Sequence, residues 1–153
     1  MPAGRAAPSA TVTCSVGQLG SATSAQIEAL AGSTAPSDIF DLASKDPSDA
    51  SFRKTISNGR TEWLRLKPGM EKAAAFLETH RYAAYVGASM GFSKMEGTTV
   101  NVRDKVAYSA LQNVQDSMVK GGKGHTDGNG IALDQALKAG AVMALNLRGG
   151  QKD

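Results

Sequence analysis

Hydrophobic and polar residues alternate most clearly on either side of Asn58-Gly59. The two flanking runs, Ser51–Ser57 and Arg60–Lys67, each place every second side chain on the same face of an extended strand. Asn-Gly is a preferred two-residue loop for a type I′ turn, because both central residues of that turn need a positive φ angle. The sequence therefore predicts a β-hairpin over Ser51–Lys67, with positive φ at both loop residues.

The turn also fixes the register of this hairpin and hence the composition of its two faces. Lys54 is expected opposite Trp63, and Phe52 opposite Arg65. One face interleaves cations with aromatic and polar side chains, a combination typical of surfaces that neutralise phosphates and stack on bases. The nucleic-acid-binding residues predicted on this face are Lys54, Thr61, Trp63, Arg65 and Lys67. The alternative interpretation is a solvated sheet surface with a packed tryptophan.

Alternation predicts further strands outside the hairpin. Ala10–Gly17 places two valines and the single cysteine on one side. Tyr82–Phe92 alternates larger residues with Gly and Ser, and is expected to form a second hairpin with Thr98–Val102 around a turn at residues 95–97. Asp38–Ser44 is compatible with either a helical turn or a strand.

Helical spacing of apolar residues predicts four helices. A short helix is expected at Ser24–Ala31, capped by Ser24 and ended by the glycine that follows. Glu71–His80 carries alanines and a leucine on one stripe. The last third predicts two longer helices, Arg103–Lys120, with Asn101 as its cap, and Ile131–Leu145.

These elements define an α+β fold class. An antiparallel sheet with hairpins occupies the first two-thirds of the chain and two C-terminal helices follow. We expect residues 1–9 to form an extended N-terminal arm and residues 10–153 to form one domain.

Charge and composition narrow the classes of function. The 153 residues carry a net charge of +3, and residues 51–81 concentrate seven basic against three acidic side chains. Localised positive charge favours a polyanionic partner, although it is also common on surfaces that serve solubility alone. No apolar run is long enough for a membrane-spanning helix, and the N-terminus lacks the apolar segment of a secretion signal. The single Cys14 excludes a disulfide within the chain and leaves pairing between chains open.

The segment His125–Gly130 is a candidate for chemistry because it combines a histidine with glycines and an aspartate. Its spacing departs from the anion-binding loop of Fic-type enzymes, from a calcium loop, whose twelfth position would be Ala136, and from the zinc D,D-peptidase motif. A loop is the simpler interpretation. The sequence predicts no catalytic residue, metal site or cofactor, and hence no enzyme.

The order of elements resembles that of the coat proteins of single-stranded RNA bacteriophages of the levivirus type. The alternating segment TVTCSVGQ, the basic hairpin SFRKTISNGRTEWLRLK, a later strand pair and two C-terminal helices carry this resemblance. It implies a dimer in which the helices of one chain lie across the sheet of the other, and a sheet surface that binds RNA. Ser24–Ala31 and Glu71–His80 would then be insertions or strands.

On this resemblance, the function is that of a self-assembling capsid subunit that packages RNA, located in the virion and assembled in the bacterial cytoplasm, with homo-oligomer and RNA as partners and no membrane. A non-enzymatic nucleic-acid-binding or adaptor protein of a phage or bacterium is the alternative. A small enzyme using the His125 loop is a third hypothesis.

Overall fold

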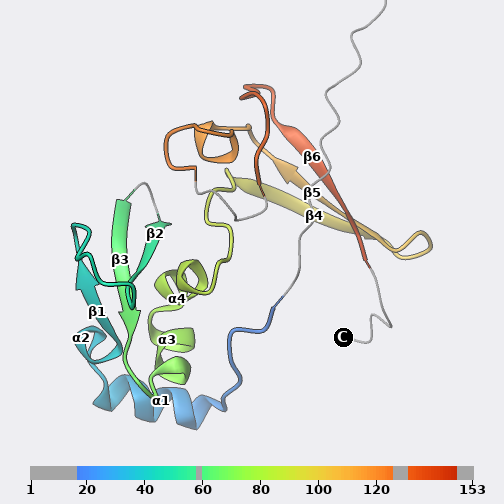
Figure 1. The fold of residues 1–153 in the computed structure, drawn as a ribbon. Helices are drawn as coiled ribbons and strands as arrows, with labels where there is room; N and C mark the ends of the chain where they lie inside the picture. The colour runs from blue at the N-terminus through green and yellow to red at the C-terminus, as the bar shows by residue number, and fades with distance from the viewer. Residues whose placement is uncertain (1–16, 58–59, 126–130, 148–153) are drawn as a thin grey trace, which may run out of the picture.

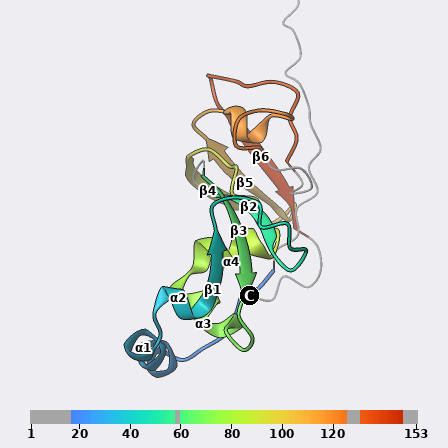
Figure 2. The same ribbon diagram turned by 60° about the vertical axis from the view of Figure 1, so that its left-hand side comes forward.

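The computed structural model describes residues 17–57, 60–125 and 131–147. Within these residues the chain has a mixed α+β fold with two three-stranded antiparallel sheets and four helices. The two sheets lie apart in Figure 1, and each has its own cluster of buried hydrophobic residues; Figure 2 shows the same fold turned by 60°. The arm at residues 1–9, the strand predicted at Ala10–Gly17 (all but its last residue) and the loop residues Asn58 and Gly59 lie outside the described residues.

The first sheet contains β1 (Phe40–Ala43), β2 (Arg53–Ser57) and β3 (Arg60–Leu66), in the order β1-β3-β2. Four helices accompany this sheet: α1 (Ser24–Ser33), α2 (Pro36–Ile39), α3 (Glu71–Leu77) and α4 (Thr79–Tyr85). The cluster at its centre consists of Ile39, Phe40, Leu64, Ala73 and Ala74. Both residues that α3 contributes to this cluster are alanines, whereas α2 contributes Ile39.

The predicted hairpin and its register are confirmed. β2 and β3 pair antiparallel, with Lys54 opposite Trp63 and Ile56 opposite Thr61. β1 adds to the other side of β3 and places Asp41 opposite Arg65. Residues 38–44, for which the sequence left a helical turn and a strand as alternatives, contain both. The helix α2 ends at Ile39, and the strand β1 begins at the next residue.

The first predicted helix is confirmed, but both of its ends differ: it continues through Gly32, where it was expected to stop, to Ser33, and its N-terminal cap is another residue. α1 is capped by Thr23, whose Oγ1 accepts the backbone N–H of Gln26 (3.3 Å), while the Gln26 side chain accepts the N–H of Thr23 (3.0 Å). This reciprocal pair satisfies two donors that a helix start leaves unpaired. The helix predicted at Glu71–His80 is divided into α3 and α4 at Glu78.

The strand predicted at Tyr82–Phe92 is wrong. Its first residues belong to α4, whose Tyr82 and Tyr85 pack on the cluster of the first sheet. Tyr85 meets Phe40 edge to face, with ring centroids 5.8 Å apart. Two aromatic residues three positions apart share one face of a helix. The packing of both tyrosines against the cluster favours a helix here more strongly than the alternating residues after them favour a strand. Gly87 ends the helical segment with a φ of 93°.

The second sheet contains β4 (Met95–Asn101), β5 (Val106–Leu111) and β6 (Ala141–Asn146), in the order β4-β5-β6. The chain between β5 and β6 covers part of one face and includes a 3₁₀ turn at Asp116–Met118. Its cluster consists of Leu111, Val114, Met118 and Ile131, each at most 5% exposed.

Both predicted C-terminal helices are wrong, and so is the pairing expected for Thr98–Val102. Residues 103–120 contain β5, which pairs with β4 on one side and β6 on the other. The residues of β5 fit two periods, because Ala107 and Leu111 lie four apart on a helix but also share one face of a strand. Pairing with the distant strands β4 and β6 favours the strand over the helix. The burial pattern agrees with a strand, because Ala107, Ser109 and Leu111 are buried while the residues between them are half-buried.

Asn101 shows why the helix start was misassigned. Its Oδ1 accepts the backbone N–H of Asp104 (3.1 Å), a contact across three residues that also occurs at a helix N-cap. Here it closes the turn between β4 and β5, with Lys105 at a φ of 56°. In the second predicted helix, Gly140 has a φ of 78°, and the carbonyl oxygens of Leu111 and Gln112 occupy the space of a Cβ atom. A helix cannot pass through that position.

Candidate nucleic-acid interface

The two faces of the first sheet have different neighbours. The face that contains Leu64 and Thr55 is buried, at 0% and 4% exposure. On that side Arg53 donates to the carbonyl oxygen of Tyr85 in α4 (3.1 Å), and its guanidinium lies 4.9 Å from the Tyr85 ring centroid. Since side chains alternate along β3, Thr61, Trp63 and Arg65 project from the opposite face.

The structure brings the five predicted residues together on this opposite face. Lys54 Nζ lies 5.8 Å from the centroid of the Trp63 ring, as expected from their cross-strand pairing. Arg65 lies over Phe52, with its guanidinium carbon 4.6 Å from the ring centroid. We call Lys54, Thr61, Trp63, Arg65 and Lys67 the basic face.

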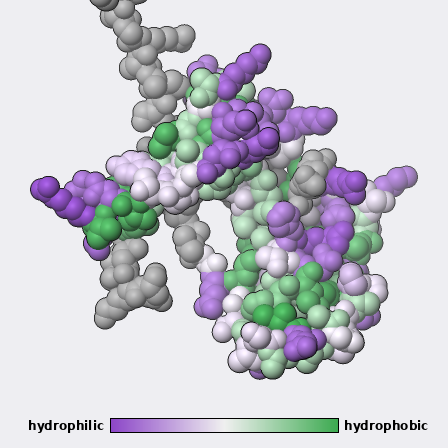
Figure 3. Space-filling view, turned by 180° about the vertical axis from the view of Figure 1, so that it is seen from behind, coloured by the Kyte–Doolittle hydropathy of each residue, from purple (hydrophilic) through white to green (hydrophobic). Residues whose placement is uncertain are grey.

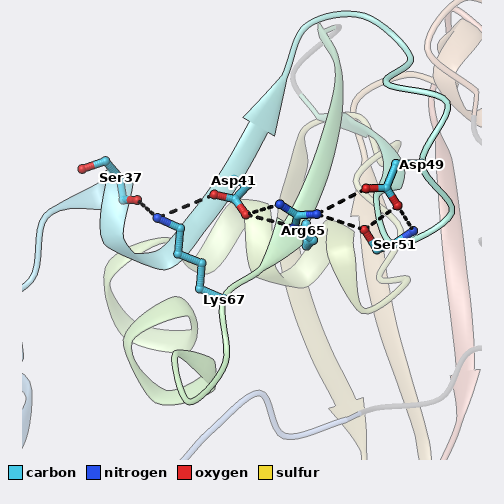
Figure 4. Close-up of polar contacts among 6 residues, drawn as sticks. All are labelled: Ser37, Asp41, Asp49, Ser51, Arg65 and Lys67. Atoms are coloured by element: carbon cyan, nitrogen blue, oxygen red, sulfur yellow. Dashed lines mark hydrogen bonds and ion pairs between the residues drawn. The ribbon is translucent and has the colours of Figure 1, made fainter.

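Arg65 is held by two carboxylates that the sequence did not place there. Its Nε and Nη2 both donate to Asp41 Oδ2, at 2.9 and 2.8 Å (Figure 4). Its Nη1 donates to Asp49 Oδ2 at 3.3 Å and to Ser51 Oγ at 3.2 Å. Because all these contacts remain partly exposed to water, they orient the guanidinium more than they stabilise the fold.

Lys67 shares the same acidic partner. Its Nζ donates to the carbonyl oxygen of Ser37 (2.8 Å) and lies 3.6 Å from Asp41 Oδ1 (Figure 4). Two of the three predicted cations therefore lie beside a carboxylate. The local excess of positive charge is smaller than the sequence of the hairpin implied.

These contacts lower the pKa of both carboxyl groups. The hydrogen bond from Arg65 is the main cause for Asp41, with the positive charges of Arg65 and Lys67 adding to it. For Asp49 the hydroxyl and backbone N–H of Ser51 are the main causes, followed by the charge of Arg65. A lowered pKa favours the ionised form, so both aspartates remain negative at neutral pH. Their contribution to stability is present above the ordinary carboxyl pKa and is lost as the pH falls through the lowered value.

Lys54 differs from the other two cations. It is exposed, and among the described residues it forms no ion pair with a carboxylate. Trp63 lies between it and Ala43 in the row of paired residues across the sheet. Because Ala43 is small, the residue paired with Trp63 in β1 does not cover the indole ring with a long side chain.

An open depression adjoins this row at the end of β1. Its volume is about 540 Å³, and its lining residues come from the ends of β1 and β3: Leu42, Ala43, Ser44, Arg60, Thr61 and Glu62. Thr61 and Ala43 thus link the depression to the neighbourhood of Trp63. This combination of an aromatic ring, a cation, a hydroxyl group and adjacent space is suited to an unpaired base with its phosphate.

The other candidate chemistry has less support in the described residues. His125 Nε2 lies 2.8 Å from the carbonyl oxygen of Ile131, while residues 126–130 of the proposed loop lie outside the described residues. The described part of the chain contains no group of three or more His, Cys, Asp or Glu placed to hold a metal ion. None of its helices has the length and apolar character needed to span a membrane.

Comparison with known proteins finds no matching family model, curated protein or solved structure.

Proposed function

We propose that this chain is a non-enzymatic nucleic-acid-binding protein that holds single-stranded RNA on the basic face of its first sheet. The observation that carries the proposal is Trp63, half-buried on the sheet face opposite α4 and beside Lys54, a cation that has no carboxylate partner among the described residues. Stacking on tryptophan requires an unpaired base, which favours a single strand over a duplex.

Each residue of the basic face has a role in this proposal. Lys54 neutralises a phosphate, and a base stacks on Trp63 from the side of Ala43, where the depression gives it room. The Thr61 hydroxyl can donate to or accept from the same nucleotide. Arg65 and Lys67 contribute only when a phosphate oxygen replaces an oxygen of Asp41 as their partner.

The direct test uses the single tryptophan of the chain as its own probe. Titration with a single-stranded homopolymer such as poly(U) is expected to quench the Trp63 fluorescence, and a duplex of equal length is not. Filter binding across a salt series then measures the contribution of Lys54. In Lys54→Ala the log–log salt slope should fall by about one unit. Lys72→Ala, an exposed cation on α3, is the matched control and should leave the slope unchanged. Absence of quenching by any single strand would contradict the proposal.

Removal of the negative charge at Asp41 is expected to strengthen RNA binding. Asp41→Asn frees Arg65 and Lys67 from their shared carboxylate and removes a charge that repels phosphate. We expect a severalfold lower Kd and a steeper salt dependence than in the wild type. Asp46→Asn, on the exposed turn after β1, removes the same charge without freeing either cation and is the control. Equal Kd values for Asp41→Asn and wild type would show that the two cations do not reach the RNA.

A self-assembling RNA-packaging capsid subunit is a second candidate. The observation that favours it is the concentration of exposed hydrophobic residues on the second sheet and in the turn after β4, where Met95, Val100, Val102 and Val142 are 49–71% exposed. Figure 3 shows a hydrophobic patch beside hydrophilic side chains at the projecting end of this sheet. The two segments predicted as helices that cross a partner's sheet contain β5 and β6 instead, so assembly would have to use another surface. Size-exclusion chromatography with absorbance at 260 and 280 nm separates the candidates: a particle containing RNA supports the capsid subunit, and a small RNA-binding species supports the simpler protein.

A further inference from the structure

We infer that the depression at the end of β1 binds one unpaired base by its Watson–Crick edge, through the backbone N–H and C=O groups of Thr61. The inference rests on the proposed function and specifies which part of the nucleotide the protein recognises. The first observation is the length of β1. Its pairing with β3 ends at Ala43, opposite Trp63, and Ser44 lies in a bend. Within the described part of the chain, the first residues of β3 therefore have no neighbouring strand on the β1 side.

Backbone hydrogen bonds identify the residue of β3 that faces this open side. Lys67 N–H donates to Ile39 C=O (3.0 Å), so Lys67 directs its backbone groups toward β1. In an antiparallel sheet successive residues direct these groups to opposite sides, which places the groups of Trp63 and Thr61 on the β1 side as well. Trp63 is paired with Ala43, whereas Thr61 has no partner in β1 and lines the depression.

One N–H beside one C=O matches the edge of a nucleobase. Every base has a donor next to an acceptor on its Watson–Crick edge, and the N3–H and O4 of uracil complement the C=O and N–H of one extended residue. A second protein strand would instead need such pairs at several alternate residues. β1 already pairs with Trp63 and Arg65, and β3 begins at Arg60, so within the described strand Thr61 alone is open. The opening therefore fits a base better than a strand.

The other residues of the depression suit the rest of a nucleotide. Leu42 is 49% exposed and offers the base an apolar contact. Arg60 is exposed and forms no ion pair among the described residues, so it is available to a phosphate. Glu62 also lines the depression, but Arg81 Nε and Nη2 donate to its two carboxylate oxygens at 3.1 and 3.3 Å. This pairing offsets a negative charge that would otherwise repel the phosphate.

The test compares two methylated forms of one oligonucleotide. Oligouridine, oligo(5-methyluridine) and oligo(3-methyluridine) of equal length carry the same phosphates, and all three can stack on Trp63. The 3-methyl group replaces the N3–H that the Thr61 C=O accepts, whereas the 5-methyl group leaves the Watson–Crick edge intact. By filter binding we expect the Kd of oligo(3-methyluridine) to be roughly 5- to 30-fold higher than that of the other two, because its edge leaves the backbone groups unpaired.

Two variants at position 61 separate the backbone from the side chain. Thr61→Val keeps both backbone groups and should keep the ratio of the Kd values for oligo(3-methyluridine) and oligouridine, although loss of the hydroxyl lowers the affinity for both. Thr61→Pro should reduce this ratio severalfold, because proline has no N–H. Proline is compatible with the position, since this N–H does not bond to β2. Hydrogen exchange needs no variant: the Thr61 amide should exchange rapidly in the free protein and slowly with oligouridine.

Arg60→Ala should lower the log–log salt slope by about one unit, with Lys72→Ala again as the control. Quenching of Trp63 by oligouridine and oligo(3-methyluridine) with equal Kd values would overturn the inference and leave the proposed function in place. A Thr61 amide that is protected without RNA would also overturn it, because another protein segment would then cover this edge. If neither oligonucleotide quenches Trp63, the proposed function is contradicted, and this inference with it.

Discussion

Val114→Asp is expected to unfold the second sheet while leaving the first sheet folded. Val114 is 2% exposed and packs against Leu111, Met118 and Ile131, and its backbone pairs with Leu137 in an isolated bridge. A carboxylate at this position would lie among the hydrophobic side chains of that cluster. Leaving a buried charge unpaired reduces the free energy of unfolding by about 3–5 kcal/mol, a large part of the stability of a small fold.

Two signals in one urea titration separate the sheets. The single tryptophan lies in β3 and reports on the first sheet, whereas far-ultraviolet circular dichroism reports on both. We expect part of the dichroism change to move to much lower urea while the Trp63 transition stays in place. Val142→Asp is the matched control, because Val142 is 68% exposed on the same sheet and should change stability little. A single transition that shifts equally in both signals would show that the two hydrophobic clusters unfold as one unit.

The elements that could be predicted from the sequence are those whose partners are near in the chain. The hairpin of β2 and β3 was predicted with its register because a two-residue loop leaves no freedom in the pairing. The helix at α1 was predicted from a local stripe and a local cap. Its cap was misassigned by one residue, since Thr23 and Ser24 are both suitable and only Thr23 has Gln26 three positions later.

The second sheet could not be predicted because local patterns left it ambiguous. β5 pairs with β6, and Leu111 meets Ala141 thirty residues further along the chain. Alanine and valine at mixed spacings satisfy a helical stripe as well as an alternating strand, so the distant pairing decides between them. The backbone of Lys105 and Gly140 is left-handed; glycine adopts this conformation readily, but lysine does not indicate it from sequence alone.

In the candidate site, too, contacts within the hairpin could be predicted and contacts with a more distant strand could not. The placement of Lys54 and Trp63 on one face followed from the hairpin, and the structure confirms their proximity. The aspartates beside Arg65 were missed. Asp41 lies in β1, which pairs with β3 although β2 lies between them in the sequence, so no short turn fixes the register of this pairing. Assigning a strand to residues 40–43 would have been the only signal in the sequence that Asp41 lies in the sheet. It would not have shown that Asp41 pairs with Arg65.

Trp63→Ala is expected to produce the largest loss of RNA binding of any single substitution on the basic face. Stacking of an unpaired base on an aromatic side chain contributes about 1–3 kcal/mol, whereas an exposed lysine–phosphate contact is weakened by salt. We therefore expect a Kd roughly 5- to 150-fold higher at moderate salt. The salt slope should change little, because the tryptophan carries no charge. This separates its role from that of Lys54, whose removal lowers the slope.

Trp63→Tyr is the conservative control and should recover most of the affinity, since its ring can still stack. Thermal unfolding of all three proteins distinguishes loss of binding from loss of structure, because Trp63 is half-buried and its removal also takes contacts from Lys54. The double variant Lys54→Ala/Trp63→Ala completes the design. If base and phosphate of one nucleotide are held together, the two losses will not add, because removal of either residue already releases the nucleotide. Unchanged affinity in a folded Trp63→Ala protein would mean that Trp63 packs the sheet and that RNA, if bound, lies elsewhere.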